Sequence, residues 1–269
     1  MNPDIRQHWP QLIDSVRDAA REIFQRVQAG RQAAERKLDG SLLTATDLML
    51  QEAISKILSA RFPGIPVLGE EMTEGEQTAI LATGNCWLLD PLDGTSNFSH
   101  GIPVYSVSLA LMQQGEVVAG LVYDPNRDEC FHALRGAGAW LDGQALDRRN
   151  DAPTRLEHAM AIIDTKRLPT GLAVAIATQN PYHSQRSFGS VALDWCWLAS
   201  GRIQTYLHGK QKLWDFAAGA LIAQEAGCLA ITLQGQPILA APLTLTARSA
   251  VGACPALAGT WPEWIRKNA

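Results

Sequence analysis

The sequence predicts a mixed α+β and α/β fold, a layered sandwich of helices and sheets arranged in two lobes. Apolar residues recur at helical spacing near the amino terminus, short strand-like segments separated by turns follow, and strand and helix patterns alternate after residue 147. At 269 residues, with 46% hydrophobic and 19% charged content, the chain can bury a substantial core. We expect one lobe over residues 1–146 and a second over 147–269, joined in one compact unit.

The first lobe is expected to begin with two helices. Residues 4–29 carry apolar side chains at helical spacing with charges between them. The polar segment 31–41 indicates a loop. A second helix should begin near Thr46-Asp47, which are good capping residues, and end at Arg61 before Phe62-Pro63-Gly64.

The rest of the first lobe is expected to form a largely antiparallel meander. Its apolar runs are short and are bounded by turn residues such as Gln113-Gln114-Gly115-Glu116. The expected strands are 67–68, 86–89, 104–112, 117–122 and 130–134, with a further turn at 140–143.

The second lobe shows strand-like and helical segments in alternation, which indicates an α/β arrangement. The expected helices cover 190–200 and 215–226, and a short helix over 255–266 should end the chain. The expected strands are 159–163, 173–177, 203–207 and 229–232.

Composition excludes several classes of function. Lys and Arg number 23 against 27 Asp and Glu, so the net charge of −4 gives no basic footprint for nucleic acid or an anionic membrane. The five cysteines are scattered and form neither a disulfide framework nor a zinc-binding spacing. The amino terminus has no apolar targeting segment, and no run is long enough to span a bilayer. We therefore expect a reduced, cytoplasmic protein.

The run from Trp87 to Thr95, Trp-Leu-Leu-Asp-Pro-Leu-Asp-Gly-Thr, carries the clearest chemistry. An apolar strand ends there in Asp90 and Asp93, and buried carboxylates are costly unless a cation neutralises them. Gly94 lets the backbone approach a ligand closely, and its N–H and that of Thr95 suit an anion. The pattern indicates a site for a divalent metal and a phosphate.

Two other acidic positions support this site. Glu70 and Glu71 follow the strand 67–68, and Asp215 begins a helix, where an isolated aspartate would be read as an N-cap. Phosphatases with an aspartate nucleophile place two aspartates two residues apart, whereas Asp90 and Asp93 are three apart. This spacing disfavours a phosphoenzyme and favours metal-activated water.

With these motifs in family order, the chain resembles the inositol monophosphatase family, within the lithium-sensitive, magnesium-dependent phosphatase superfamily. The resemblance extends from about residue 37 to residue 230 and implies a fold of the inositol monophosphatase and fructose-1,6-bisphosphatase type. The motifs that carry it are Gly69-Glu70-Glu71, Trp87 to Phe98, and Trp214-Asp215-Phe-Ala-Ala-Gly219, with weaker matches at Thr44 to Asp47, Gly120 to Pro125 and Gly189 to Ala192.

The resemblance implies a role for each matched position. The implied ligands of two or three Mg²⁺ ions are Glu70, Asp90, the carbonyl of Leu92, Asp93 and Asp215. The implied catalytic residues are Glu70, Thr95 and Asp47, with Asp47 orienting Thr95. Phosphate and substrate would contact Asp93, Gly94, Thr95, Gly189, Ser190, Val191 and His208. Lys37 and residues 39–41 would form a loop near a third metal, and a homodimer and inhibition by Li⁺ are implied as well.

Substrate choice is where the sequence departs from the inositol-specific members. These carry an acidic residue seven positions before the last metal aspartate, and this chain has His208 there, followed by Gly-Lys-Gln-Lys. His208 belongs either to a variable solvated loop or to a pocket for a more anionic alcohol. The interval between Ile163 and Arg186 is short, so a helix there is expected to be reduced or missing.

Three functions follow in order. The first is hydrolysis of inositol 1-phosphate or a related polyol or sugar phosphate. The second is a phosphatase for adenosine 3′,5′-bisphosphate or another small metabolite such as histidinol phosphate. The third is a family member that acts mainly by binding a regulatory partner, and the filled metal positions disfavour it.

Overall fold

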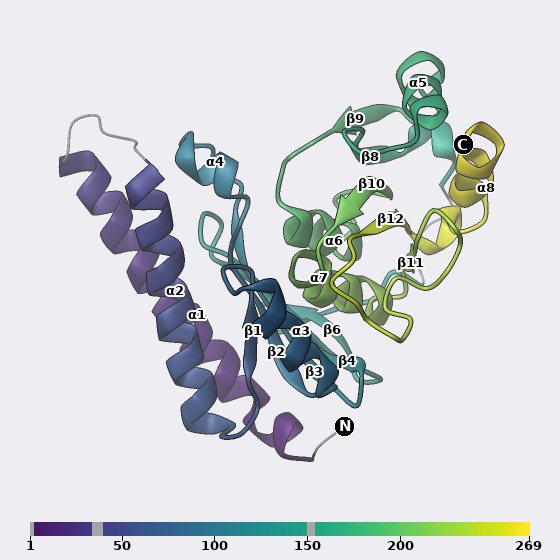
Figure 1. The fold of residues 1–269 in the computed structure, drawn as a ribbon. Helices are drawn as coiled ribbons and strands as arrows, with labels where there is room; N and C mark the ends of the chain where they lie inside the picture. Colours follow the sequence, from purple (N-terminus) through teal and green to yellow (C-terminus); the bar gives the residue numbers. More distant parts are fainter. Residues whose placement is uncertain (1–2, 34–39, 150–153) are drawn as a thin grey trace.

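The computed structural model describes residues 3–33, 40–149 and 154–269, and these form five stacked layers (Figure 1). A helix pair covers a seven-stranded sheet, two central helices separate that sheet from a five-stranded one, and a further helix pair covers the outer face (Figure 1). Three hydrophobic clusters fill the spaces between these layers. The layered sandwich expected from the sequence is confirmed.

The first layer consists of α1 (Pro3–Ala33) and α2 (Gly40–Arg61). Their apolar side chains, Leu12 and Leu50 among them, pack with the outer face of the first sheet. The expected capping role of Thr46-Asp47 is wrong, because the helix begins at Gly40 and these residues lie about two turns inside it. The expected loop over 31–41 falls partly on helical residues and partly outside the described residues.

The seven-stranded sheet follows the chain in order, and only its first pair is parallel. Helix α3 (Glu74–Ala82), which the sequence analysis did not predict, connects that pair. The strands are β1 (Val67–Gly69), β2 (Cys86–Asp93), β3 (Ser106–Gln113), β4 (Glu116–Asp124), β5 (Glu129–Leu134), β6 (Gly138–Leu141) and β7 (Gln144–Leu146). The expected meander is confirmed, with longer strands.

The central layer contains α6 (Val191–Ala199) and α7 (Leu213–Glu225), and nearly every residue of both helices is buried. Small residues allow these helices to approach closely. A Cβ on Gly219 would lie 2.7 Å from the Cβ of Trp195 and 2.9 Å from the carbonyl oxygen of Ala192. The expected helices 190–200 and 215–226 are confirmed, although the second begins two residues earlier.

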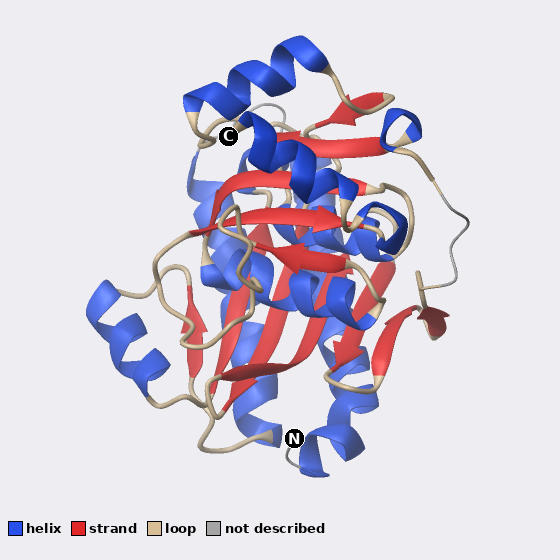
Figure 2. Cartoon of the chain, turned by 90° about the vertical axis from the view of Figure 1, so that its right-hand side faces the viewer, coloured by secondary structure: helices blue, strands red, loops and turns tan. Residues whose placement is uncertain are grey.

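The five-stranded sheet has the order β11-β12-β10-β8-β9. Its strands run across the direction of those in the first sheet (Figure 2). The strands are β8 (Met160–Asp164), β9 (Ser184–Arg186), β10 (Thr205–Gln211), β11 (Leu229–Ile231) and β12 (Arg248–Ala253). Strands near 159–163, 203–207 and 229–232 were expected, whereas β9 and β12 were not.

The outer layer contains α5 (Thr170–Gln179) and α8 (Thr260–Asn268), which pack on the second sheet with the short 3₁₀ turns Leu156–His158 and Pro255–Leu257 nearby. Two expectations are wrong here. Residues 173–177 are helical rather than extended, and the interval between Ile163 and Arg186 contains a ten-residue helix. The expected final helix is present, but it is divided at Ala258-Gly259.

The remaining connections lie at the surface, apart from α4 (Thr95–Ser99), which follows β2 directly. Within the described residues, every helix is too short or too polar to cross a bilayer. All five cysteines are buried, as expected for Cys86 and Cys196.

Candidate metal and phosphate site

Asp90 and Asp93 lie on the same face of the first sheet because β2 contains an irregularity between them. Asp90 pairs with Ser108 and Asp93 with Ser106, so three positions on β2 match two on β3. In a regular strand, residues three apart would point to opposite faces, and the extra residue cancels this alternation. Pro91 occupies the irregular position, which is where a central strand tolerates proline. The Pro-Leu spacing therefore brings the two carboxylates together.

Both carboxylates are buried, with Asp90 3% exposed and Asp93 7% exposed. Asp90 Oδ1 accepts a 3.0 Å hydrogen bond from the N–H of Leu92. Asp93 Oδ2 accepts hydrogen bonds from the Ser190 hydroxyl at 2.6 Å and the Ala192 N–H at 2.8 Å, and its Oδ1 accepts one from the Val191 N–H at 3.2 Å. Asp93 is thus fixed at the N-terminus of α6.

The phosphate turn follows directly. Gly94 has φ +94°, and a Cβ there would lie 2.9 Å from the carbonyl oxygen of Val104, so glycine is required for both reasons. The Thr95 hydroxyl donates a 3.0 Å hydrogen bond to the Leu92 carbonyl. Asn97 donates to the carbonyls of Val104 (2.8 Å) and Phe188 (2.6 Å), which holds α4 against the Gly189 turn.

Asp215 is the third residue of α7 rather than its N-cap, which is Lys212. Its Oδ2 accepts a 2.8 Å hydrogen bond from the Lys212 N–H, so it still satisfies a free donor at the helix start. Glu70 follows β1, and its carbonyl accepts a 3.1 Å hydrogen bond from the buried Gln77 amide of α3. The expected N-cap role of Asp215 is wrong by three residues.

Electrostatics shows that these carboxylates face one another. Burial raises the pKa of Asp90 well above its usual range, and the charges of Asp93, Asp215 and Glu70 add to the shift. Burial and the charge of Asp93 raise the pKa of Asp215 to about 8. Partial desolvation, followed by the charges of Glu71 and Asp93, raises the pKa of Glu70, although Glu70 is exposed as a residue. Mutual repulsion of this kind favours a bound cation.

Asp47 lies near this cluster but does not contact Thr95 as expected. Burial, followed by the charges of Glu71 and Glu70, raises the pKa of Asp47 to about 6. Its Oδ1 is buried without a hydrogen-bond partner among the described residues, and the Thr95 hydroxyl bonds to Leu92 instead. The expected orientation of Thr95 by Asp47 is absent from this structure.

His208 is 6% exposed, so it belongs to a packed wall rather than to a solvated loop. Its Nε2 lies 3.4 Å from Asp164 Oδ2, and its Nδ1 accepts a 3.2 Å hydrogen bond from the Lys210 N–H. The hydrogen bond with His208 lowers the pKa of Asp164 to about 2. His208 also favours the ionised form of Asp93, which places it beside the cluster.

Sequence reasoning gave no role to three residues that shape the site. Asp164 follows a predicted strand, the same signal that identified Asp90, and it pairs with His208. Asn97 lies within the recognised motif and bridges two turns. Asp194 is 3% exposed, with one carboxylate oxygen unpartnered, and burial and the charge of Asp93 raise its pKa. An acidic residue among apolar neighbours in α6 was the available signal for Asp194.

The donor set fits a divalent cation. Glu70, Asp90, Asp93 and Asp215 supply hard carboxylate oxygens, and their raised pKa values show that the protein alone does not neutralise them. Within the part of the chain that the structure describes, no three His, Cys, Asp or Glu side chains are arranged so that they could share one ion. The chemistry fits, while the bound geometry is left to ligation itself. Lys37 and Asp39 lie outside the described residues.

Comparison with known proteins decides the family. A sequence profile described as "Inositol monophosphatase family" matches residues 6–266. The chain belongs to this family. It is 32% identical over 256 residues to an inositol-1-monophosphatase of Caulobacter vibrioides, covering 85% of this chain and 94% of that protein. It is also 36% identical over 204 residues to the Nus factor SuhB of Pasteurella multocida, covering 74% of each.

Solved structures of the inositol monophosphatase family have the same fold. Inositol monophosphatase II of Staphylococcus aureus superposes with a TM-score of 0.77 at 26% identity, covering 96% of this chain and 95% of that one. A structure of SaIMPase-II bound to 2′AMP gives the same TM-score and identity, covering 98% and 96%. Membership supports a phosphatase that uses divalent metal ions.

Proposed function

We propose that this chain is a Mg²⁺-dependent phosphomonoesterase that hydrolyses inositol 1-phosphate or a related polyol phosphate with metal-activated water. The observation that supports this most is the convergence of buried Asp90 and Asp93 with Asp215 and Glu70, each with a raised pKa, beside the Gly94-Thr95 turn. Such a cluster is costly to fold and has value only when cations occupy it. Family membership gives the reaction class.

Each residue has a definable task under this proposal. Asp90, Asp93, Asp215, Glu70 and the Leu92 carbonyl would hold two or three ions. Bound divalent cations lower the pKa of a coordinated water and neutralise phosphate charge. Glu70, whose pKa is raised, would accept the proton of the attacking water.

The turn and α6 would position the substrate. The N–H groups of Gly94 and Thr95 would hold phosphate oxygens, since backbone donors at a helix start suit an anion. The Thr95 hydroxyl, fixed on the Leu92 carbonyl, would orient the water. Gly189, Ser190 and Val191 would face the hydroxyl side of the substrate, because the Ser190 and Val191 donors already meet Asp93 there. A homodimer, as in the family expectation, is part of the proposal.

A nucleotide 3′-phosphatase is the second candidate, and one observation favours it. His208 replaces an acidic residue on a buried wall and adjoins Lys210 and Lys212. Imidazole and ammonium groups suit a substrate with a second anionic group better than a neutral polyol. The relative solved with 2′AMP makes a nucleotide a reasonable probe for this chain.

Phosphate release separates these candidates. The purified chain would be assayed with Mg²⁺ on inositol 1-phosphate, adenosine 3′,5′-bisphosphate, fructose 1,6-bisphosphate and histidinol phosphate, each with and without Li⁺. We expect Mg²⁺-dependent, Li⁺-inhibited release with the highest kcat/KM on inositol 1-phosphate. A higher value on the nucleotide would replace the first candidate by the second.

The same assay tests the reading as a binding protein. Asp93→Asn should abolish turnover while circular dichroism shows an intact fold. Full activity of that variant with Mg²⁺ would contradict the site. Absence of release from every substrate by the wild type would contradict the enzyme and leave partner binding, as for the relatives named Nus factor SuhB.

A further inference from the structure

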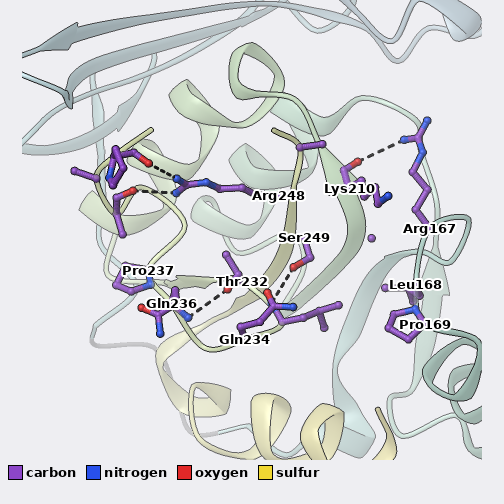
Figure 3. Close-up of a pocket in the computed structure, with 16 residues that line it drawn as sticks. Arg167, Leu168, Pro169, Lys210, Thr232, Gln234, Gln236, Pro237, Arg248 and Ser249 are labelled. Atoms are coloured by element: carbon purple, nitrogen blue, oxygen red, sulfur yellow. Dashed lines mark hydrogen bonds between the residues drawn. The ribbon is translucent and has the colours of Figure 1, made fainter. Parts of the chain in front are cut away.

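A cavity of about 740 Å³ lies away from the carboxylate cluster, between β10, residues 167–169 and residues 232–249 (Figure 3). Three of its lining residues, Arg167, Lys210 and Arg248, are basic and none is acidic. A chain with net charge −4 therefore has a locally positive hollow. Its size falls within the roughly 300–1,000 Å³ range of small-molecule sites.

Arg248 is built into one wall of the cavity. Its Nη1 donates to the carbonyls of Ile238 (2.7 Å) and Ala240 (3.0 Å), and its Nη2 donates to that of Pro242 (2.7 Å). These bonds fix the guanidinium without neutralising it, because all three acceptors are uncharged. Partial burial lowers the pKa of Arg248, as expected for a cation that has no carboxylate beside it.

Arg167 and Lys210 form the other end of the cavity (Figure 3). Arg167 Nη1 donates a 3.4 Å hydrogen bond to the Lys210 carbonyl, so the two residues share one wall. Gly209 allows this approach, since a Cβ there would lie 2.3 Å from the carbonyl carbon of Arg167. Among the described residues, no carboxylate forms an ion pair with Arg167, Lys210 or Arg248.

The rest of the lining is suited to an organic body. Leu168, Pro169 and Pro237 supply apolar surface, and the Ser249 hydroxyl and Gln234 amide supply neutral polar groups. Ser249 Oγ accepts a 3.0 Å hydrogen bond from the Leu233 N–H, which leaves its proton available to a ligand. Inorganic phosphate alone would leave most of this volume and apolar surface unused.

We propose that this cavity is an accessory binding site for a small organic phosphate, with the phosphate at Arg167 and Lys210 and the organic group along the apolar wall. A phosphate dianion gains more than a single carboxylate from several uncompensated cations. None of the proposed metal ligands lines the cavity, so binding here requires no metal. The Lys210 N–H bonds to His208, which places the accessory site next to the wall of the carboxylate site.

Titration calorimetry in EDTA tests the proposal with adenosine 5′-monophosphate, adenosine and inorganic phosphate as probes. Removal of metal leaves the carboxylate cluster anionic, so it repels phosphate and the accessory site is measured alone. We expect saturable one-to-one binding of the monophosphate, at least tenfold weaker binding of inorganic phosphate, and no saturable binding of adenosine. Affinity should fall as salt concentration rises.

A matched pair of variants distinguishes the site from a general charge effect. Arg167→Gln should weaken monophosphate binding at least tenfold. Lys166→Gln removes the same charge from the adjacent exposed residue, which does not line the cavity, and should change binding less than twofold. Thermal melting checks that both variants are folded. Absence of saturable monophosphate binding, equal binding of adenosine, or equal weakening in both variants would overturn the proposal. Phosphatase activity with Mg²⁺ is a separate measurement, so the two proposals fail independently.

Discussion

The Asp93 carboxylate and the Ser190 hydroxyl are joined by a 2.6 Å hydrogen bond across 97 positions of sequence. Asp93 ends β2 of the first sheet, and Ser190 is the N-cap of α6 in the central layer. Ser190 also lies 3.3 Å from the Ser106 hydroxyl of β3. The two layers that form the candidate site are therefore fixed to each other through one of its carboxylates.

Ser190→Ala should lower kcat while the fold remains intact. A hydrogen bond to a charged group contributes about 1.5–3 kcal/mol, so loss of orientation at Asp93 should reduce turnover roughly 10–100-fold. Ser190→Thr retains the hydroxyl and serves as the control, with activity near that of the wild type. Steady-state kinetics and thermal melting measure both effects. Unchanged kcat in Ser190→Ala would show that Asp93 does not depend on this bond.

Asp90→Asn should remove activity and yet stabilise the metal-free protein. Asn keeps an oxygen that can accept the Leu92 N–H, while it removes a buried charge that faces Asp93 and Asp215. In EDTA we therefore expect a higher melting temperature than for the wild type, and with Mg²⁺ no further increase. Glu74→Gln, at an exposed position of α3, is the control and should leave both values unchanged. A normal Mg²⁺-induced stabilisation of Asp90→Asn would contradict its assignment as a ligand.

Metal-free protein should lose stability as pH rises from about 4 to about 8. The folded state holds the Asp215 proton with a pKa of about 8, against an ordinary value of 3.8, so it binds more protons than the unfolded chain over that interval. Asp47, with a pKa raised to about 6, acts in the same direction. Mg²⁺ binds the ionised carboxylates, and its stabilising effect should therefore be larger at pH 8 than at pH 5. Melting curves with EDTA and with Mg²⁺ at each pH check this, and a pH-independent Mg²⁺ effect would refute it.

The carboxylates were predictable from the sequence because their signal is local. An apolar run that ends in Asp90 and Asp93 is unusual whatever its surroundings. That they share a face depends on the pairing of β2 with β3, which spacing alone does not reveal. His208 was left between a solvated loop and a pocket wall, since its burial and its pairing with Asp164 come from a parallel neighbour 44 positions earlier.

Secondary structure was mistaken where short apolar runs fit two patterns. Residues 173–177 were expected as a strand, but the buried residues Leu172, Ala175 and Ile176 have helical spacing. Strand β12 contains small residues and only one β-branched residue, so its signal is weak. Helix α3 had a usable signal, because Thr73 and Glu76 form a capping box.

His208→Glu should destabilise the protein and alter substrate choice together. The introduced carboxylate would stand where His208 Nε2 lies 3.4 Å from Asp164, and repulsion there should cost about 1–3 kcal/mol. Adding Asp164→Asn should restore most of that loss, as a double-mutant cycle would show. In the restored background, the ratio of kcat/KM for inositol 1-phosphate over adenosine 3′,5′-bisphosphate should rise. An unchanged ratio would remove His208 from the substrate site.

Gly209→Ala should be strongly destabilising because two backbones meet at that residue. The new Cβ would lie 2.3 Å from the carbonyl carbon of Arg167, 2.4 Å from its oxygen and 2.7 Å from the Leu168 nitrogen. Neither neighbour is a flexible side chain, so β10 must separate from the segment that connects β8 to α5, at an expected cost of about 2–4 kcal/mol. Gly171→Ala is the matched control, since its Cβ would meet no atom within 4 Å and it lies in α5, where alanine is favoured over glycine. Denaturant unfolding measures both, and a loss below about 1 kcal/mol for Gly209→Ala would mean that this contact relaxes readily.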